Sequence, residues 1–158
     1  MKTYQLPIVA VAGLALITTG PAQAHVRHHT SHHAHPAAIP SGAKLMATLT
    51  GAAEVPAGDA DASGTFSATI NVGQTQLCYE LKATGLATPT AAHIHAGAAG
   101  QNGGPVVMLA APANGTSKAC VAVTTDLAKK LIDNPQGYYV NVHNAEFPGG
   151  GLRGQLSK

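Results

Sequence analysis

Two histidines near the middle of the chain have a spacing that suits metal binding. The segment AAHIHAG places His93 and His95 two positions apart, with Ile94 between them. In a β-strand, residues i and i+2 lie on the same face, so both imidazoles point one way while Ile94 enters the core. Zinc and copper ions accept imidazole nitrogen, and two rings one strand step apart can chelate one ion. The pair therefore predicts part of a Cu or Zn site.

A third histidine, His143, ends the segment YYVNVH. If the two valines of this segment face the core, His143 lies on the opposite face. The imidazoles of His93, His95 and His143 can then converge on one ion, with Glu54 or Glu146 as an oxygen ligand or as an acceptor behind a histidine. The alternative is that these histidines only hydrogen-bond loops at one end of the fold and fix their shape.

Six more histidines lie close together nearer the N-terminus, at His25, His28, His29, His32, His33 and His35. If a leader is cleaved after Ala24, the free amine and the imidazole of His25 can chelate Cu²⁺ together. The three-residue copper motif is absent, because Arg27 stands where that motif needs histidine. His-rich tracts of this kind bind Zn, Cu or Ni, whereas the alternative is a flexible polar spacer. We predict a disordered arm, residues 25–43, that binds metal loosely.

The first 24 residues have the layout of a secretory signal peptide. Lys2 precedes an apolar stretch from Leu6 to Ile17, and Ala22-Gln23-Ala24 gives the small-x-small pattern of a cleavage site. About 12 apolar residues fall short of the ~20 that a membrane-spanning helix needs, and no second such segment follows. We therefore predict a periplasmic or secreted protein without a membrane span after cleavage.

Composition and motifs argue against several function classes. The net charge is +2 with scattered Lys and Arg, which does not indicate a nucleic-acid partner. The sequence has no GxSxG, no P-loop and no GxGxxG, and its aspartates suit turns and caps. We therefore expect a non-catalytic protein.

Two cysteines, Cys78 and Cys120, lie in the part of the chain that would be exported. An oxidising compartment pairs such residues, and closing a loop of this length stabilises a fold by about 4 kcal/mol. Both cysteines fall on the outward side of the strands predicted below, which suits a bridge between neighbouring strands or across the outer face of a sheet. The alternative is a pair of unconnected thiols.

From residue 44 to residue 158 the hydrophobic pattern has a period close to two, with turn residues between the runs. It predicts strands over 44–50, 65–71, 76–84, 91–96, 105–110, 118–123, 138–143 and 152–156. One helix is predicted, capped by Thr125 and ended by Asn134-Pro135. Short strands with regular turn signals indicate an all-β fold, an antiparallel Greek-key β-sandwich with one short helix.

Several motifs of this domain, in this order, resemble those of the CHRD domain, which is named for its occurrence in chordin. They are Leu49-Thr50-Gly51, Glu54-Val55-Pro56, Ala62-Ser63-Gly64, Ala92-His93-Ile94-His95, Gly104-Pro105-Val106-Val107, Tyr139-Val140-Asn141-Val142-His143, Pro148-Gly149-Gly150 and Leu152-Arg153-Gly154-Gln155-Leu156. The resemblance extends from about Lys44 to Ser157.

This resemblance implies an extracellular or periplasmic β-sandwich module. A structural or adhesive module that binds protein or polysaccharide in the cell envelope is therefore an alternative to metal binding. The domain is also distantly similar to Cu/Zn superoxide dismutase, where an HxH pair binds copper and an arginine guides the anion, here Arg153. Too few histidines remain in the domain for the bridging ligand and the separate zinc set that a dismutase needs.

Overall fold

The computed structural model describes residues 42–158. The predicted signal peptide (1–24), all but the last two residues of the predicted arm (25–43), and His25 lie outside the described residues. Within residues 42–158, no helix is long and apolar enough to cross a bilayer.

Eight strands form one hydrogen-bonded sheet in the order β5-β4-β7-β8-β1-β2-β3-β6, and all pairings are antiparallel. The bounds are β1 Ala43–Thr50, β2 Ser63–Asn71, β3 Gln76–Thr84, β4 Ala91–Ala96, β5 Pro105–Leu109, β6 Thr116–Ala122, β7 Tyr138–His143 and β8 Leu152–Gln155. All eight predicted strands are confirmed, with ends that differ by at most two residues.

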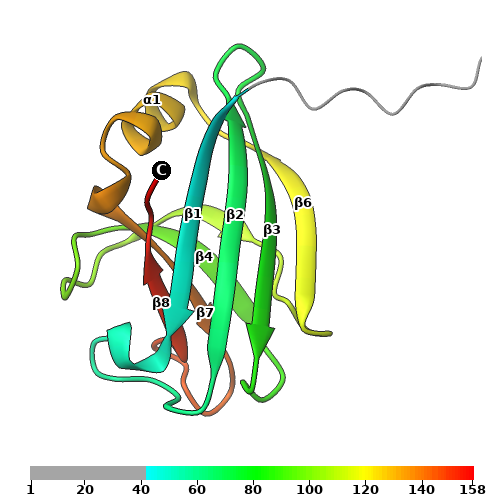
Figure 1. The fold of residues 1–158 in the computed structure, drawn as a ribbon, viewed down its shortest axis with the longest axis vertical. Coiled ribbons are helices and arrows are strands. Elements are labelled where there is room, and N and C mark those ends of the chain that lie inside the picture. The colour runs from blue at the N-terminus through cyan, green and yellow to red at the C-terminus, as the bar shows by residue number, and fades with distance from the viewer. Residues whose placement is uncertain (1–41) are drawn as a thin grey trace, which may run out of the picture. The chain divides into compact units, whose positions relative to one another are not determined.

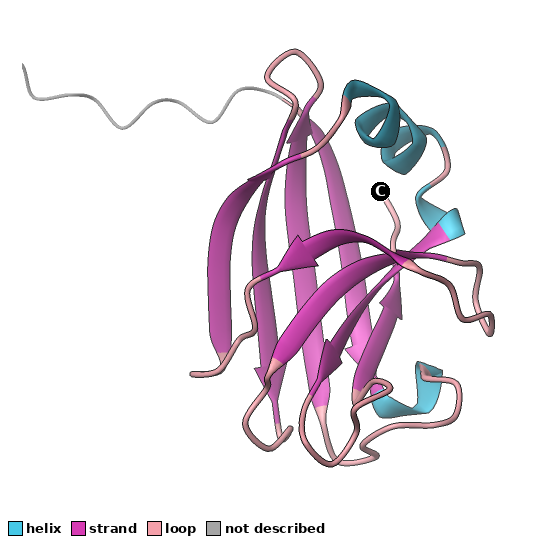
Figure 2. Cartoon of the chain, turned by 180° about the vertical axis from the view of Figure 1, so that it is seen from behind, coloured by secondary structure: helices cyan, strands magenta, loops and turns pink. Residues whose placement is uncertain are grey.

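The sheet curls so that β1, β2, β3 and β6 form one layer, while β4, β5, β7 and β8 form the other (Figures 1 and 2). The strands β3 and β6 are neighbours in one layer, although the β4–β5 hairpin between them in the chain belongs to the other. Such crossing connections are a Greek-key feature. The predicted all-β sandwich with one short helix is therefore confirmed, with both layers belonging to a single sheet.

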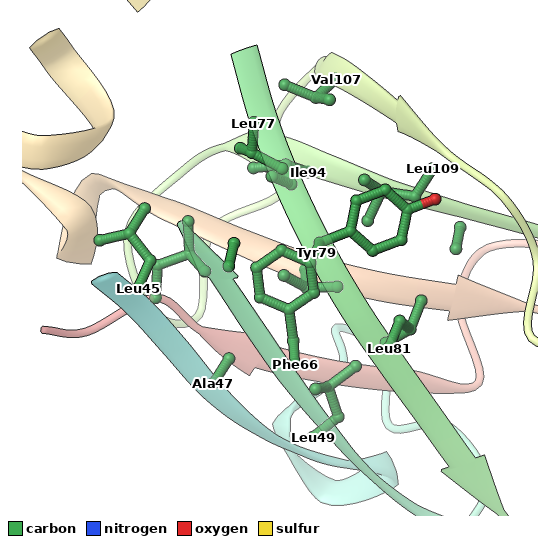
Figure 3. Close-up of a cluster of buried hydrophobic side chains, with 14 of the residues drawn as sticks. Leu45, Ala47, Leu49, Phe66, Leu77, Tyr79, Leu81, Ile94, Val107 and Leu109 are labelled. Atoms are coloured by element: carbon green, nitrogen blue, oxygen red, sulfur yellow. The ribbon is translucent and has the colours of Figure 1, made fainter. Parts of the chain in front are cut away.

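The core lies between the two layers. Alternate residues of the strands are buried there, as the period-two pattern requires: Leu77, Tyr79 and Leu81 of β3 point inward, as does Ile94 of β4. Figure 3 shows these side chains in the core together with Phe66, whose ring stacks on that of Tyr79 at 5.9 Å between centroids. Because Ile94 is completely buried, its neighbours in β4 must face outward.

The one α-helix among residues 42–158, α1 (Thr125–Asp133), connects the two layers between β6 and β7. Its N-cap is Thr124, whose hydroxyl accepts a hydrogen bond from the backbone N–H of Leu127 at 3.2 Å. The prediction that Thr125 caps the helix was therefore wrong by one residue, since two adjacent threonines offer the same hydroxyl. Asn134 ends the helix as predicted, and the 3₁₀-helix η2 (Pro135–Gly137) leads into β7.

The two cysteines form a disulfide between neighbouring strands. Cys78 of β3 and Cys120 of β6 are directly opposite in the register, and both face away from the core. The bridge therefore links the edge strand β6 to the rest of its layer. It agrees with an extracytoplasmic domain, because such bonds persist in oxidising compartments.

Candidate metal centre

The three predicted histidine ligands lie together on the outer face of the layer that contains β4 and β7. His93 and His95 flank the buried Ile94, so both imidazoles face away from the core. His143 is the last residue of β7, and Asn141, two residues earlier, pairs directly with His93. Since i and i+2 share a face, His143 lies on the same face as both β4 histidines.

The distances within this cluster suit a single ion. One ring nitrogen from each of His93, His95 and His143 can be chosen so that all three lie within 4.8 Å of one another. The ring centroid of His93 lies 5.0 Å from that of His143 and 5.4 Å from that of His95. Zinc–nitrogen bonds of about 2.0–2.1 Å in tetrahedral geometry place ligand nitrogens roughly 3.4 Å apart, so small side-chain rotations suffice to bind an ion.

Backbone carbonyls fix the orientation of two of these imidazoles. His95 Nδ1 lies 2.8 Å from Gly103 O, and His143 Nδ1 lies 3.0 Å from Pro148 O. A carbonyl only accepts, so both Nδ1 atoms donate, and the lone pair of each ring is on its Nε2. Histidine ligands of metals commonly donate their other ring nitrogen in this way. The Nε2 of His95 is buried without any hydrogen-bond partner, as a ligand atom without its ion would be.

The remaining histidine, His93, forms a hydrogen bond with His143. His93 Nδ1 is 3.1 Å from His143 Nε2. Because His143 donates from its Nδ1, its Nε2 accepts and His93 donates. An ion bound between the three rings would replace this hydrogen bond, and His93 would have to turn a lone pair toward it.

Tyr139 packs against the histidine cluster, and Arg153 packs against Tyr139. The ring of Tyr139 stacks on the imidazole of His95 at 4.9 Å, with an angle of 10° between the planes. The guanidinium carbon of Arg153 lies 3.4 Å from the centroid of the same Tyr139 ring. Arg153 is only 1% exposed, so it cannot guide an anion from solvent as the dismutase likeness suggests.

Arg153 also holds the glycine-rich connection between β4 and β5, here called the 97–104 loop. Its guanidinium donates to the carbonyls of Ala98 and Gln101 and to the side chain of Asn102. The same loop supplies Gly103, whose carbonyl orients His95. The arginine therefore fixes the loop that fixes a candidate ligand. The sequence showed the glycines of this loop but gave no sign that Arg153 binds it.

Of the two acids predicted near the histidines, only Glu54 is buried at this face. Glu54 lies after the 3₁₀-helix η1 (Gly51–Ala53) and is 6% exposed, against the side chain of Asn141. Glu146 is exposed in the connection between β7 and β8. Neither acid belongs to the group of potential ligand atoms within 4.8 Å, so the candidate ligands are the three histidines.

The pKa values of the site predict how stability depends on pH. Burial, reinforced by neighbouring imidazoles, lowers the pKa values of His93 and His143 below 6.5. The unfolded chain therefore binds protons that the folded chain does not, and these groups lower the free energy of unfolding as pH falls below 6.5. Burial raises the pKa of Glu54 from 4.5 to about 6, although Asn141 and Arg153 oppose this rise. The contribution of Glu54 to the free energy of unfolding therefore has the opposite pH dependence. It is fully present below pH 4.5 and is lost as pH rises through about 6.

We therefore expect Glu54→Gln to steepen the loss of stability in acid. The substitution removes the contribution of Glu54, which grows as pH falls, and leaves those of the two histidines. Urea denaturation of the metal-free protein between about pH 4.5 and 6.5 measures the effect. Parallel pH profiles for the parent and the variant would contradict this assignment.

Gly150 provides the space in which Glu54 and Asn141 meet. A Cβ on Gly150 would lie 2.2 Å from Glu54 Oε1 and 2.9 Å from Asn141 Nδ2, and its φ is 143°. We expect Gly150→Ala to lower the free energy of unfolding by about 1–3 kcal/mol, measured by urea denaturation. The matched control is Gly149→Ala, where nothing lies within 4 Å of the added Cβ. Equal midpoints for both variants would refute this role.

The comparisons with known proteins agree with this architecture. A scan of protein families matched the CHRD domain over residues 45–156, a range that runs from β1 to just beyond β8 and includes the three histidines. A comparison with curated proteins gave no match. Since the family match covers most of the sequence and all eight strands, the chain belongs to the CHRD domain family.

Proposed function

We propose that this CHRD domain is an exported, non-catalytic module that binds one Zn or Cu ion through His93, His95 and His143. The observation that carries the proposal is the convergence of three imidazoles, two of which already donate from Nδ1 to backbone carbonyls. The CHRD family is not a known enzyme family. In this proposal, the role of the protein is to hold a metal ion in the periplasm or outside the cell.

The histidines of residues 25–35 extend this proposal. Their number and spacing suit low-affinity capture of the same ions, with His25 as the chelating N-terminus if cleavage follows Ala24. In this view the arm collects metal and the domain holds it more tightly, because the domain ligands are oriented before the ion arrives.

A structural envelope module is the second candidate, and one observation favours it. The hydrogen bonds from His95 to Gly103 O and from His143 to Pro148 O also tie down two loops. On this alternative the histidines shape a surface that binds protein or polysaccharide, and metal has no effect on the domain.

Calorimetric titration with Zn²⁺ separates the two candidates. The protein to use is a background variant in which the six histidines of residues 25–35 are alanine, so that only the domain histidines remain. Metal binding predicts one ion per chain and a melting temperature that rises with Zn²⁺ concentration. Absence of both effects would leave the structural alternative.

A further inference from the structure

The three-histidine site has no negative charge of its own to balance a metal ion. Imidazoles bind metals in their neutral form, so the whole charge of the ion stays on a partly buried face. Arg153 adds a positive charge nearby. It lies opposite Asn141 in the register of β8 and β7, and Asn141 lies opposite His93 in the register of β7 and β4. A charge in such surroundings is unfavourable unless an opposite charge compensates it.

Glu54 is the one buried acid among residues 42–158, and its Oε1 has no hydrogen-bond partner. Glu54 Oε1 and Asn141 Nδ2 both lie within 3 Å of the point where a Cβ on Gly150 would be. The two side chains therefore share one small space, and one of them, Asn141, is the cross-strand neighbour of His93. The unpartnered oxygen of Glu54 and the amide oxygen of Asn141, also unpartnered and buried, are acceptors that lack a donor or a cation.

The turn between β7 and β8 connects this carboxylate to the histidines. Pro148 O accepts the hydrogen bond from His143 Nδ1, and two residues later Gly150 makes room for Glu54. Burial raises the pKa of Glu54 to about 6, and Asn141 and Arg153 lower it without cancelling that rise. A cation bound by the histidines would compensate the negative charge of this carboxylate.

Building on the proposed metal site, we infer that Glu54 supplies the balancing charge and makes the site prefer a divalent ion over a monovalent one. Zn²⁺ and Cu⁺ test this directly, because both are closed-shell ions that accept imidazole, whereas their charges differ by one. At an effective dielectric constant of about 20, two unit charges separated by about 10 Å interact by roughly 1.7 kcal/mol, which corresponds to about tenfold in affinity for each unit of ionic charge. In this inference Glu54 acts on the ion through the charge of its carboxylate and is not itself a ligand.

The experiment compares Glu54→Gln with its parent, the background variant, for both ions. Affinities for Zn²⁺ and, without oxygen, for Cu⁺ are measured by competition against colorimetric chelators. The substitution keeps the size of the side chain and removes its charge. Glu146→Gln removes the same charge from an exposed position in the β7–β8 connection and is the matched control.

We expect Glu54→Gln to lower the Zn²⁺ affinity about tenfold more than the Cu⁺ affinity, and Glu146→Gln to change their ratio by less than about threefold. An equal loss for both ions, including complete loss through misfolding, would overturn the inference, as would unchanged affinities. Failure of the parent to bind either ion is a different result, because it contradicts the proposed metal site itself.

Discussion

Replacing Arg153 by methionine is expected to lower the free energy of unfolding by about 3–5 kcal/mol, the range for removing one partner of a buried charge network. Arg153 is buried between the Tyr139 ring and the 97–104 loop. The variant leaves the carbonyls of Ala98 and Gln101 without their donor and leaves the charge of Glu54 without its nearby cation. Methionine fills similar apolar volume, so the loss reports mainly the missing charge and hydrogen bonds.

Urea denaturation measures this loss against an exposed cation. Lys82→Met removes a surface salt bridge to Glu80, at 2.9 Å between partly exposed side chains. Surface pairs of this kind contribute about 0–1 kcal/mol, so the control should stay close to the parent. If Arg153→Met unfolded at the same urea concentration as Lys82→Met, Arg153 would not have the role given to it here.

Replacing His95 by alanine is expected to lower the Zn²⁺ affinity of the background variant by at least about 100-fold, beyond the roughly 10–100-fold cost of losing a residue behind a ligand. His95 is the most buried of the three histidines, and its Nε2 is already free of hydrogen bonds. Two remaining imidazoles leave the ion with more water ligands and without a fixed cage.

The affinity is measured by calorimetric titration with Zn²⁺. Lys129→Ala on α1 is the control for expression and handling. A second variant, Gly103→Ala, is unsuitable, because its Cβ would lie 1.6 Å from Ala96 O and disturb the loop itself. Affinity retained within about threefold in His95→Ala would remove His95 from the proposed ligand set.

Strand alternation explains why much of the site was predictable. Ile94 is a large apolar residue between two histidines, so burying it forces His93 and His95 onto the outer face. The valines Val140 and Val142 fix the orientation of His143 in the same way, and both are completely buried. Which strands neighbour each other cannot be read from such a pattern, and the contact between the two segments emerges only from the pairing of β4 with β7.

The partners that orient the site were not predictable, because they come from loops. Gly103 and Pro148 contribute only backbone carbonyls, which carry no signature in the side-chain sequence. Arg153 occupies a strand position where charge normally indicates a solvent-facing residue, yet the 97–104 loop covers it completely. Glu54 and Glu146 were equivalent candidates in the sequence, and only the packing of the Glu54 segment against Asn141 and Gly150 separates them.

Anomalous diffraction at the zinc absorption edge, from crystals of the Zn²⁺-loaded background variant, tests the central claim most directly. The account predicts one strong peak between β4 and the end of β7, at about 2.0–2.1 Å from a ring nitrogen of each of His93, His95 and His143. A zinc peak that touches fewer than two of these imidazoles, or no zinc peak at this face of the sheet, would contradict it.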